Sequence, residues 1–159
     1  MQVKSRHHLR SDEIGALETS LAEHLGIDLA GEAYERVEFV DTDREVVLVD
    51  GEPLVASFDG ELFVTVRGAN AHPPENHVVT VDAGAISFVS DGANVMRPGI
   101  TDATEDIGPG DLVVVVEETH AKALAIGRAE TDGSDMVGDS GMVVESLHHV
   151  GDDLYAFRV

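Results

Sequence analysis

The sequence predicts an α+β fold, in which an N-terminal helix and a small antiparallel sheet precede a small closed or nearly closed β-barrel. Three patterns predict it. Apolar residues recur every three or four positions over residues 11–25, which is typical of an amphipathic helix. The period changes to two from Glu35 onward, which is typical of strands. Two continuous apolar runs, at residues 111–118 and 123–130, indicate strands that are buried on both faces or form a barrel wall.

The predicted helix has recognisable ends. Ser11 can cap its N-terminus, and Asp12 and Glu13 place negative charge beside the positive end of the helix dipole. Gly26 follows the last apolar residue and is suited to end the helix in the left-handed conformation. The apolar stripe between these ends consists of Ile14, Leu17, Leu21 and Leu25. These signals predict a helix that packs one face against the rest of the chain.

Four short alternating segments follow the helix and predict the antiparallel sheet. Their sequences are ERVEFVD, EVVLVD, PLVASF and ELFVTV, and short polar turns join them. The pair Asp59-Gly60 between two apolar runs is a strong hairpin signal. The segment RGANAHPPENH, residues 67–77, contains two prolines and is typical of a linker. We therefore predict two domains, residues 1–72 and residues 73–159, on turn chemistry alone.

Strands dominate the predicted second domain, together with one short helix. VVTVD (residues 78–82) and GMVVESLHHV are typical of strands, and AISFVSD is typical of a short helix. Gly127 in the middle of an apolar run is typical of a bend in a barrel. DLYAFRV is predicted as the last strand, joined to the strand before it by Gly151-Asp152-Asp153. Short strands at close spacing favour the barrel.

The net charge limits what can be inferred about partners. The chain carries 31 acidic and 10 basic side chains, which gives a net charge of −21. One interpretation is avoidance of nucleic acid and other anionic partners. The interpretation that we favour is adaptation to molar salt, where the Debye length is about 3 Å and an acidic surface stays hydrated without self-repulsion. In that case the charge says little about which partners the protein binds.

The absence of cysteine excludes disulfides, thiolate metal sites and cysteine nucleophiles. The N-terminus lacks the apolar segment of a signal peptide, and no apolar run approaches the length of a membrane-spanning helix. We therefore expect a cytoplasmic protein that does not insert into a membrane.

Motifs with catalytic or metal-binding chemistry are weak or absent. GDSGM, residues 138–142, is similar to the nucleophile loop of trypsin-like serine proteases, but the chain is far too short for that fold and has methionine where the loop needs glycine. The pairs His7-His8 and His148-His149 point to opposite faces if they lie on strands, which disfavours shared metal binding. Neither the P-loop pattern nor GxGxxG occurs. We therefore expect no enzyme activity, no catalytic residue, no cofactor and no metal.

The segment SDGANVMRPGI, residues 90–100, is the strongest candidate for a binding loop. Gly92 is placed to end the preceding short helix in the left-handed conformation. Pro98 prevents further helix, and Gly99 lets the backbone approach a neighbour or a ligand closely. Local physics alone fits a tight helix-to-strand turn and a binding loop equally well.

The blocks VDAGAISFVSDGANVMRPGI, GDLVVVV, ALAIGRA and GMVVESLHHVGDDLY resemble the PUA domain, an RNA-binding module. Their order and spacing match over residues 77–157. The N-terminal part more weakly resembles the pre-PUA domain. This pairing is found in archaeal proteins related to the eukaryotic malignant-T-cell-amplified translation factor, and the acidic composition favours a haloarchaeal member. The resemblance implies a pre-PUA-like helix and sheet followed by a PUA pseudo-β-barrel.

The resemblance also implies a function and a site. It implies a non-catalytic RNA-binding protein that acts in translation initiation or recycling, or in rRNA maturation, at the small ribosomal subunit. Implied partners are rRNA or tRNA and a translation-initiation-factor-like protein. In the family, RNA lies over the short helix, the turn after it and the closing strands, which assigns RNA binding to Gly84, Ala85, Gly92, Ala93, Asn94, Met96, Arg97, Pro98, Gly99, His148 and Tyr155.

Three further arginines are candidates for phosphate contacts, because the guanidinium group pairs well with phosphate. They are Arg67, Arg128 and Arg158. The alternative function is a protein-interaction adaptor, in which the N-terminal domain docks a translation-factor partner and the barrel serves as a scaffold.

Overall fold

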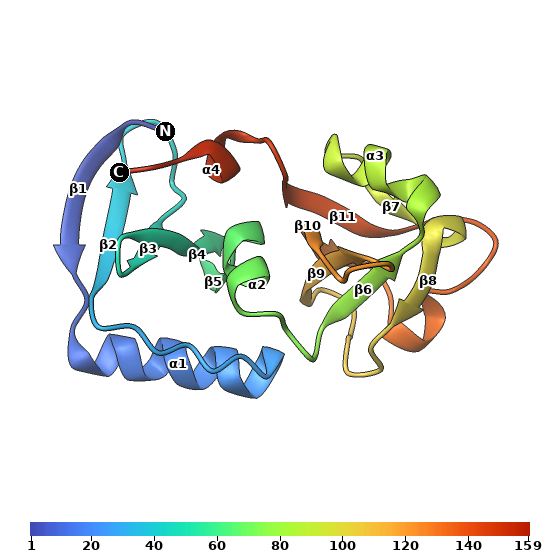
Figure 1. Cartoon of the computed structure of the whole chain (residues 1–159), viewed down its shortest axis with the longest axis horizontal. Coiled ribbons are helices and arrows are strands. Elements are labelled where there is room, and N and C mark those ends of the chain that lie inside the picture. Colours follow the sequence, from blue (N-terminus) through green and yellow to red (C-terminus); the bar gives the residue numbers. More distant parts are fainter.

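The computed structural model describes residues 1–159, and its N-terminal half contains a five-stranded antiparallel sheet. The elements of this half, in chain order, are β1 (Val3–His8), α1 (Ser11–Leu25), β2 (Tyr34–Phe39), β3 (Val46–Val49), β4 (Glu52–Phe58), β5 (Glu61–Val64) and α2 (Val66–Ala71). The strands pair in sequence order, so each strand lies beside its neighbours in the chain. Helix α1 runs below this sheet in the view of Figure 1.

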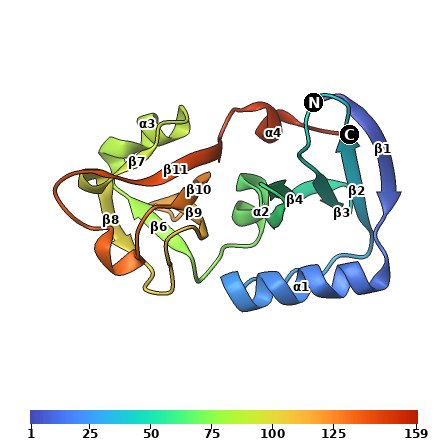
Figure 2. The same cartoon turned by 180° about the vertical axis from the view of Figure 1, so that it is seen from behind.

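The C-terminal half contains a six-stranded, nearly closed barrel. Its elements are β6 (Val78–Val81), the short 3-10 helix η1 (Ala83–Ala85), α3 (Ile86–Ser90), β7 (Val95–Met96), η2 (Arg97–Gly99), β8 (Ile100–Ala103), β9 (Leu112–Glu117), β10 (Ala123–Ala129), η3 (Gly133–Asp135), β11 (Met142–His149) and α4 (Asp153–Ala156). The strand order is β7-β11-β10-β9-β6-β8, and β6 and β9 pair in parallel. The predicted α+β class, with a small antiparallel sheet and a nearly closed barrel, is confirmed. Figure 2 shows α3 and β7 at the margin of the barrel that lies away from α1.

Helix α1 has the predicted length, but its N-terminal cap is one residue earlier than expected. Ser11 is the first helical residue, and Arg10 is the capping position. The carboxylate of Glu13 accepts a hydrogen bond from the backbone N–H of Arg10 at 3.1 Å, which satisfies a free donor at the helix start. At the other end Gly26 has a φ of 69°, and its N–H donates to the carbonyl of Ala22. The predicted C-cap is therefore confirmed.

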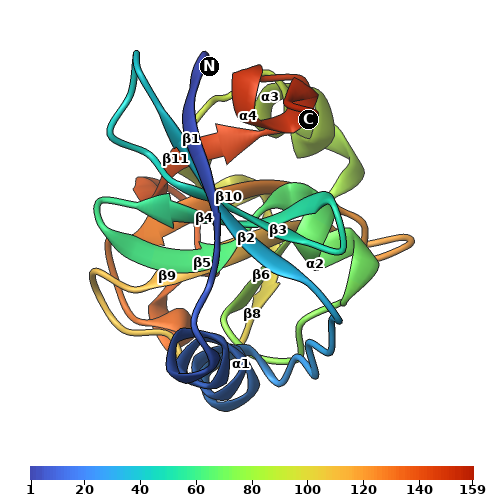
Figure 3. The ribbon, with the colours of Figure 1, turned by 90° about the vertical axis from the view of Figure 1, so that its left-hand side faces the viewer.

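One apolar core runs from the first sheet into the barrel. Leu48 and Phe58 of the sheet belong to the same buried cluster as Val114 and Ile126 of the barrel. The chain end also returns to the sheet, because the ring of Phe157 packs edge-on against Phe39, with ring centroids 5.1 Å apart. Figure 3 shows α4 and the C-terminus beside the strands of the first sheet. The two halves therefore pack as one body, and the boundary between residues 72 and 73 stays a prediction from turn chemistry.

The segment predicted as a linker begins with a helix, which corrects the sequence prediction. The hydroxyl of Thr65 caps α2 by accepting a hydrogen bond from the N–H of Gly68 at 3.0 Å. Gly68 is buried, and a Cβ on it would collide with the carbonyl oxygen of Leu54. Pro73 lies beyond the helix end. Packing against β4 thus stabilises a helix that glycine and short polar residues disfavour locally.

The segment DLYAFRV is not a strand, so the predicted closing hairpin does not form. Residues Asp153–Ala156 form the single-turn helix α4. The carboxylate of Asp152 caps this turn by accepting hydrogen bonds from the N–H groups of Tyr155 and His149, both at 2.9 Å. The Asp-Asp pair therefore starts a helix instead of joining two strands.

Strand β1 was not predicted from the sequence. Five of its six residues are exposed, so it lacks the alternation of apolar and polar residues that marks a half-buried strand. It pairs antiparallel with β2 from Val3 to His8. None of the helices is long and apolar enough to span a lipid bilayer.

Candidate functional site

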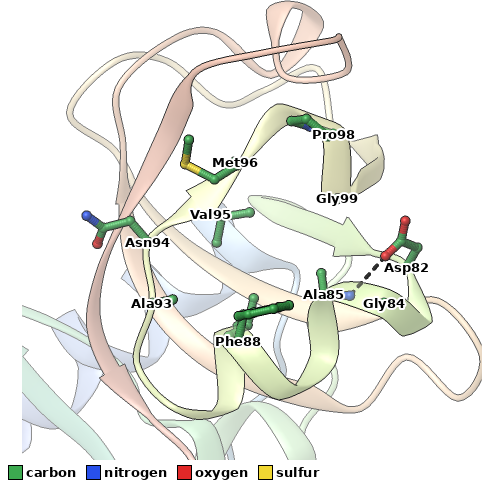
Figure 4. A pocket seen from close by; sticks show the side chains of 11 residues that line it. Asp82, Gly84, Ala85, Phe88, Ala93, Asn94, Val95, Met96, Pro98 and Gly99 are labelled. Atoms are coloured by element: carbon green, nitrogen blue, oxygen red, sulfur yellow. Dashed lines mark hydrogen bonds between the residues drawn. The ribbon is translucent and has the colours of Figure 1, made fainter.

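A cavity of about 430 Å³ opens between α3, β7 and η2, at the margin of the barrel (Figure 4). Its lining is mainly apolar and includes no cationic side chain. The lining residues are Asp82, Gly84, Ala85, Phe88, Val89, Ala93, Asn94, Val95, Met96, Pro98 and Gly99. All of them come from one continuous segment, residues 82–99, which folds back on itself and encloses the cavity.

Two short helical turns form one wall of the cavity. The carboxylate of Asp82 accepts a hydrogen bond from the N–H of Ala85 at 3.0 Å and caps η1. The N–H of Asp82 donates to the carbonyl of Gly99 at 2.9 Å, which ties η1 to η2. A Cβ on Gly99 would lie 3.0 Å from the Cβ of Ala85. The absence of a side chain at Gly99 thus allows the two turns to approach this closely.

The turn after α3 forms the opposite wall. Gly92 has a φ of 93°, in the left-handed region that favours glycine. The N–H of Ala93 then donates to the carbonyl of Phe88 at 3.0 Å and closes the turn. Gly92 does not line the cavity; it lies against the imidazole of His149. Its predicted left-handed conformation is confirmed, and its place in the structure is to shape the turn.

Asn94 fastens this turn to the barrel. Its Oδ1 accepts a hydrogen bond from the N–H of Ser146 on β11 at 2.9 Å. The side-chain nitrogen of Asn94 makes no hydrogen bond within the protein, and the residue is exposed. The amide nitrogen of Asn94 is therefore a free donor beside the cavity, on a side chain that points away from Phe88 and Met96 (Figure 4).

Two large apolar side chains are exposed at the cavity. Phe88 on α3 is 67% exposed, and Met96 on β7 is 49% exposed. Figure 4 shows them on opposite walls of the hollow. Together with the apolar hollow, these two side chains form a contiguous apolar surface, and such surfaces often mark a binding site.

Phe88 was not among the predicted site residues. The available signal was the pair Phe88-Val89 on a very short helix, since adjacent helical residues cannot both face the core. Val89 is 2% exposed, so Phe88 faces outward. Deciding which of the two is buried required the tertiary structure.

Most of the predicted RNA-binding residues meet at this cavity. Those that line it are Gly84, Ala85, Ala93, Asn94, Met96, Pro98 and Gly99. Arg97 lies beside the cavity but does not line it. Its Nε donates to the carbonyl of Asp135 at 2.9 Å, and its Nη1 donates to the carbonyl of Ser140 at 3.0 Å. Arg97 therefore holds the loop around η3, and its Nη2 is the guanidinium nitrogen that remains without a partner.

His148 cannot contact RNA through its side chain, which corrects its predicted place in the site. The residue is fully buried, and its Nε2 accepts a hydrogen bond from the N–H of Val66 at 3.1 Å. Its Nδ1 lies 2.9 Å from the carboxylate of Asp152. Phe58 stacks on the imidazole. The side chain therefore joins the barrel to the first sheet.

The charge states at His148 follow from this environment. Burial lowers the pKa of His148 below 6.5, although the hydrogen bond to Asp152 opposes the shift. Burial acts to raise the pKa of Asp152, but the hydrogen bonds from His148 and from two backbone N–H groups outweigh it and lower that pKa to about 2. A neutral imidazole thus donates from Nδ1 to an ionised carboxylate and accepts at Nε2.

Tyr155 lies on α4, away from the cavity. The guanidinium carbon of Arg67 lies over its ring, 4.3 Å from the ring centroid, and the Nε of Arg67 donates to the carbonyl of Tyr155 at 2.9 Å. Arg158 donates to the same carbonyl. One face of the ring is thus occupied by a cation within the protein.

The three arginines predicted for phosphate contacts do not converge on the cavity. Arg67 and Arg158 bind the backbone around Tyr155. Arg128 donates to the carbonyl of Gly110 at 2.7 Å and lies 3.4 Å from the carboxylate of Asp59. The cavity therefore offers stacking and hydrogen bonding, without positive charge. No cluster of three or more His, Asp or Glu side chains is arranged to hold a metal ion.

Comparison with known proteins agrees with this architecture. A PUA-domain family model matches residues 77–151. An uncharacterized protein of Methanocaldococcus jannaschii is 34% identical over 161 residues, which cover 99% of each chain. Translation machinery-associated protein 20 of Saccharomyces cerevisiae is 35% identical over 133 residues, which cover 78% of this chain and 74% of the yeast protein.

A solved structure is also similar along nearly the whole chain. The conserved PUA domain protein from Thermoplasma acidophilum superposes with a TM-score of 0.83 at 27% identity, covering 95% of this chain and 97% of that chain. The likeness thus includes the N-terminal sheet as well as the barrel. The chain belongs to the family of PUA-domain proteins that includes translation machinery-associated protein 20 and malignant T-cell-amplified sequence 1.

Proposed function

We propose that this chain is a non-catalytic RNA-binding protein of translation initiation or recycling, or of rRNA maturation, that acts at the small ribosomal subunit in the cytoplasm. The PUA match supports an RNA-binding role, and the yeast relative is named for its association with the translation machinery. The proposed partners are rRNA or tRNA and a translation-initiation-factor-like protein.

The exposed ring of Phe88 beside a mainly apolar cavity is the observation that carries this proposal. Single-stranded RNA is commonly recognised by stacking of unpaired bases on aromatic side chains and by hydrogen bonds to base edges. Phe88 and Met96 offer two apolar surfaces, and the free amide nitrogen of Asn94 offers a donor. We propose that an unpaired nucleobase enters the cavity and that the RNA backbone stays outside it, near Nη2 of Arg97.

The experiment compares Phe88→Ala with the unmodified protein in binding a fluorescently labelled single-stranded RNA. Base stacking on an aromatic side chain contributes about 1–3 kcal/mol, so affinity is expected to fall roughly 5- to 150-fold. The melting temperature should change little because the ring is mostly exposed. Val137→Ala is the matched control, since Val137 is 58% exposed and does not line the cavity. Equal affinities of the protein and of Phe88→Ala would overturn the proposed site.

A duplex of the same RNA supplies a second comparison. Paired and stacked bases cannot enter the cavity, so the duplex should bind more weakly than the single strand. Tighter binding of the duplex, or an identical loss of both affinities in Phe88→Ala, would contradict the nucleobase assignment.

We also propose that the acidic surface is an adaptation to high salt. Counterion release contributes little to RNA affinity near molar salt, so an RNA site there must depend on stacking, hydrogen bonds and shape. A cavity lined without cations fits that requirement. With a net charge of −21, the protein is expected to unfold below about 0.5 M salt through acidic repulsion. A melting temperature that is the same in 0.1 M and 3 M KCl would refute this adaptation.

A second candidate function is a protein-interaction adaptor that docks a translation-factor partner through its N-terminal half. The exposed outer strand of the first sheet favours it, because a strand with a free edge can pair with another chain. The two functions are compatible, since β1 lies at the opposite end of the molecule from α3 and β7, which line the cavity (Figure 1).

A further inference from the structure

The N-terminal strand β1 and the two residues that follow it hold an unusual concentration of positive charge. Lys4, Arg6 and Arg10 are three of the ten basic side chains in the chain, and His7 and His8 lie between them. No acidic residue occurs before Asp12. In a chain with 31 acidic residues, this segment is a local reversal of charge.

Strand β1 is also a free edge. It is the outermost strand of the first sheet and pairs only with β2. The register with β2 shifts between Val3 and Ser5, which leaves Lys4 as the extra residue of a bulge. Only Ser5 of β1 is partly buried, and the other five residues are exposed. One side of the β1 backbone therefore faces solvent along the strand.

Part of the charge on β1 is available to a partner. Arg6 makes two hydrogen bonds with the carboxylate of Glu35, at 2.7 and 3.0 Å. The side chains of Lys4, His7 and His8 make no hydrogen bond or ion pair within the protein, although His8 lies opposite Glu35 in the pairing of β1 with β2. Arg6 already shows that this face accepts a carboxylate in paired geometry.

Protection of the edge against aggregation accounts for Lys4 and the bulge, because lysine and bulges both discourage unwanted strand pairing. It does not account for the further basic side chains Arg6, His7 and His8. Asp and Glu outnumber Lys and Arg roughly threefold in this chain, so acidic residues would be the expected choice. The positive sign calls for a partner that is negative.

We infer that β1 is a strand-addition site for an extended acidic peptide segment of a partner protein. An added strand lies about 4.8 Å outside β1 and pairs with its free backbone groups. Carboxylates of that peptide then lie beside the side chains of Lys4, His7 and His8, which have no partner within the protein. This inference rests on the second candidate function proposed above and names the chemistry of its partner, and it concerns a different surface from the RNA site.

Two other occupants fit this edge less well. A second copy of the chain would pair β1 with β1 and place positive side chains opposite positive side chains, which is destabilising. An RNA strand is wider than one added β-strand and would also cover Glu35 and Glu38 of β2, the strand next to β1. A single extended peptide lies on the opposite side of β1 from these carboxylates.

The test uses a fluorescein-labelled octapeptide of alternating glutamate and valine with the full chain, in the lowest salt at which the protein stays folded. The double variant Lys4→Glu/His8→Glu should weaken binding of this peptide at least tenfold. The matched control is Lys122→Glu/His120→Glu, which makes the same change in formal charge at exposed positions between β9 and β10. The control should change affinity less than twofold.

Backbone pairing is tested separately from charge. The same peptide with N-methyl groups on alternate backbone nitrogens should lose binding, and the unmodified peptide should slow amide hydrogen exchange in residues 3–8. The inference is overturned by an absence of saturable binding at millimolar peptide or by equal losses in the two double variants. It is also overturned if the N-methylated peptide binds as tightly as the unmodified one. A further contrary outcome is that Lys4→Glu/His8→Glu weakens binding of a ten-nucleotide oligouridylate more than binding of the peptide. RNA binding at the Phe88 cavity is unaffected by any of these outcomes.

Discussion

The imidazole of His148 accepts a hydrogen bond at Nε2 from the backbone N–H of Val66, 82 residues earlier in the chain. Val66 is the first residue of α2, and His148 lies near the end of β11. The contact therefore joins the first sheet to the barrel. It requires a neutral imidazole, because a proton on Nε2 would face the N–H of Val66.

Removal of the imidazole should destabilise the whole chain. His148→Ala leaves the buried N–H of Val66 without an acceptor, removes a partner of Asp152 and opens a cavity beside Phe58. We expect a loss of about 2–4 kcal/mol in the free energy of unfolding, measured by chemical denaturation. His120→Ala is the control, because His120 is exposed and should change stability by less than about 0.5 kcal/mol. If His148→Ala also lowers the free energy of unfolding by less than about 0.5 kcal/mol, the contact does not have the proposed role.

The same contact predicts a pH dependence of stability. The pKa of His148 in the folded protein lies below the ordinary value of 6.5 because the side chain is buried. Below pH 6.5 the unfolded chain therefore binds a proton that the folded chain does not, and stability falls as the pH falls. Asp152, with a pKa lowered from 3.8 to about 2, adds a second loss as the pH falls through that interval.

This dependence can be isolated with His148→Gln, in which position 148 no longer titrates. The melting temperature of the unmodified protein is expected to fall more steeply between pH 6.5 and pH 5 than that of the variant, in the same salt. Parallel curves for the two proteins would show that other histidines, and not His148, cause the acid sensitivity.

Arg97 is expected to order the loop around η3. Its guanidinium spans the carbonyls of Asp135 and Ser140, so Arg97→Ala should speed amide hydrogen exchange in residues 133–141 and lower stability by about 1–3 kcal/mol. Arg97→Lys retains the charge but cannot span both carbonyls, and it should loosen the same loop. Exchange rates unchanged in both variants would mean that the loop is held without Arg97.

The turn beside the cavity should not tolerate a side chain at Gly92. A Cβ there would lie 2.7 Å from Nε2 of His149, whose Nδ1 is held 2.9 Å from the carbonyl oxygen of Ser90. Gly92→Ala combines left-handed strain with this overlap and is expected to cost about 2–4 kcal/mol. Gly60→Ala separates the two effects, because Gly60 has a φ of 83° with nothing within 4 Å, and it should cost about 1 kcal/mol. Equal costs for the two variants in thermal unfolding would argue against the close approach to His149.

Periodic patterns identified the elements whose local and tertiary preferences agree. Helix α1 combines an apolar stripe with acidic residues at its start and Gly26 at its end, and it has the predicted residue range. The blocks around GANVMRPGI identified the family, and most residues assigned from them line the cavity. The predictions of the helix and of the family succeeded because each depended on residues that are neighbours in the chain. The assignment of RNA binding to the cavity residues stays a prediction.

Elements decided by distant contacts were not predicted. Helix α2 forms because Gly68 packs on Leu54 of β4, and no local pattern records that contact. Helix α4 was missed for a different reason, because its contacts are local but Asp152 serves both as a helix cap and as the partner of a buried histidine. Local chemistry at both places was ambiguous, and packing selected the helix.

The sequence did not determine which side chains of the site are exposed to solvent. The sequence alone established an acidic α+β protein with a Gly-rich turn between a short helix and a strand. Tertiary structure decided that Phe88 faces solvent, that His148 is buried and that Arg97 turns toward a loop. The physical reason is that a residue's exposure depends on which surfaces pack against it, and at these three positions the packing surfaces come from parts of the chain far away in sequence.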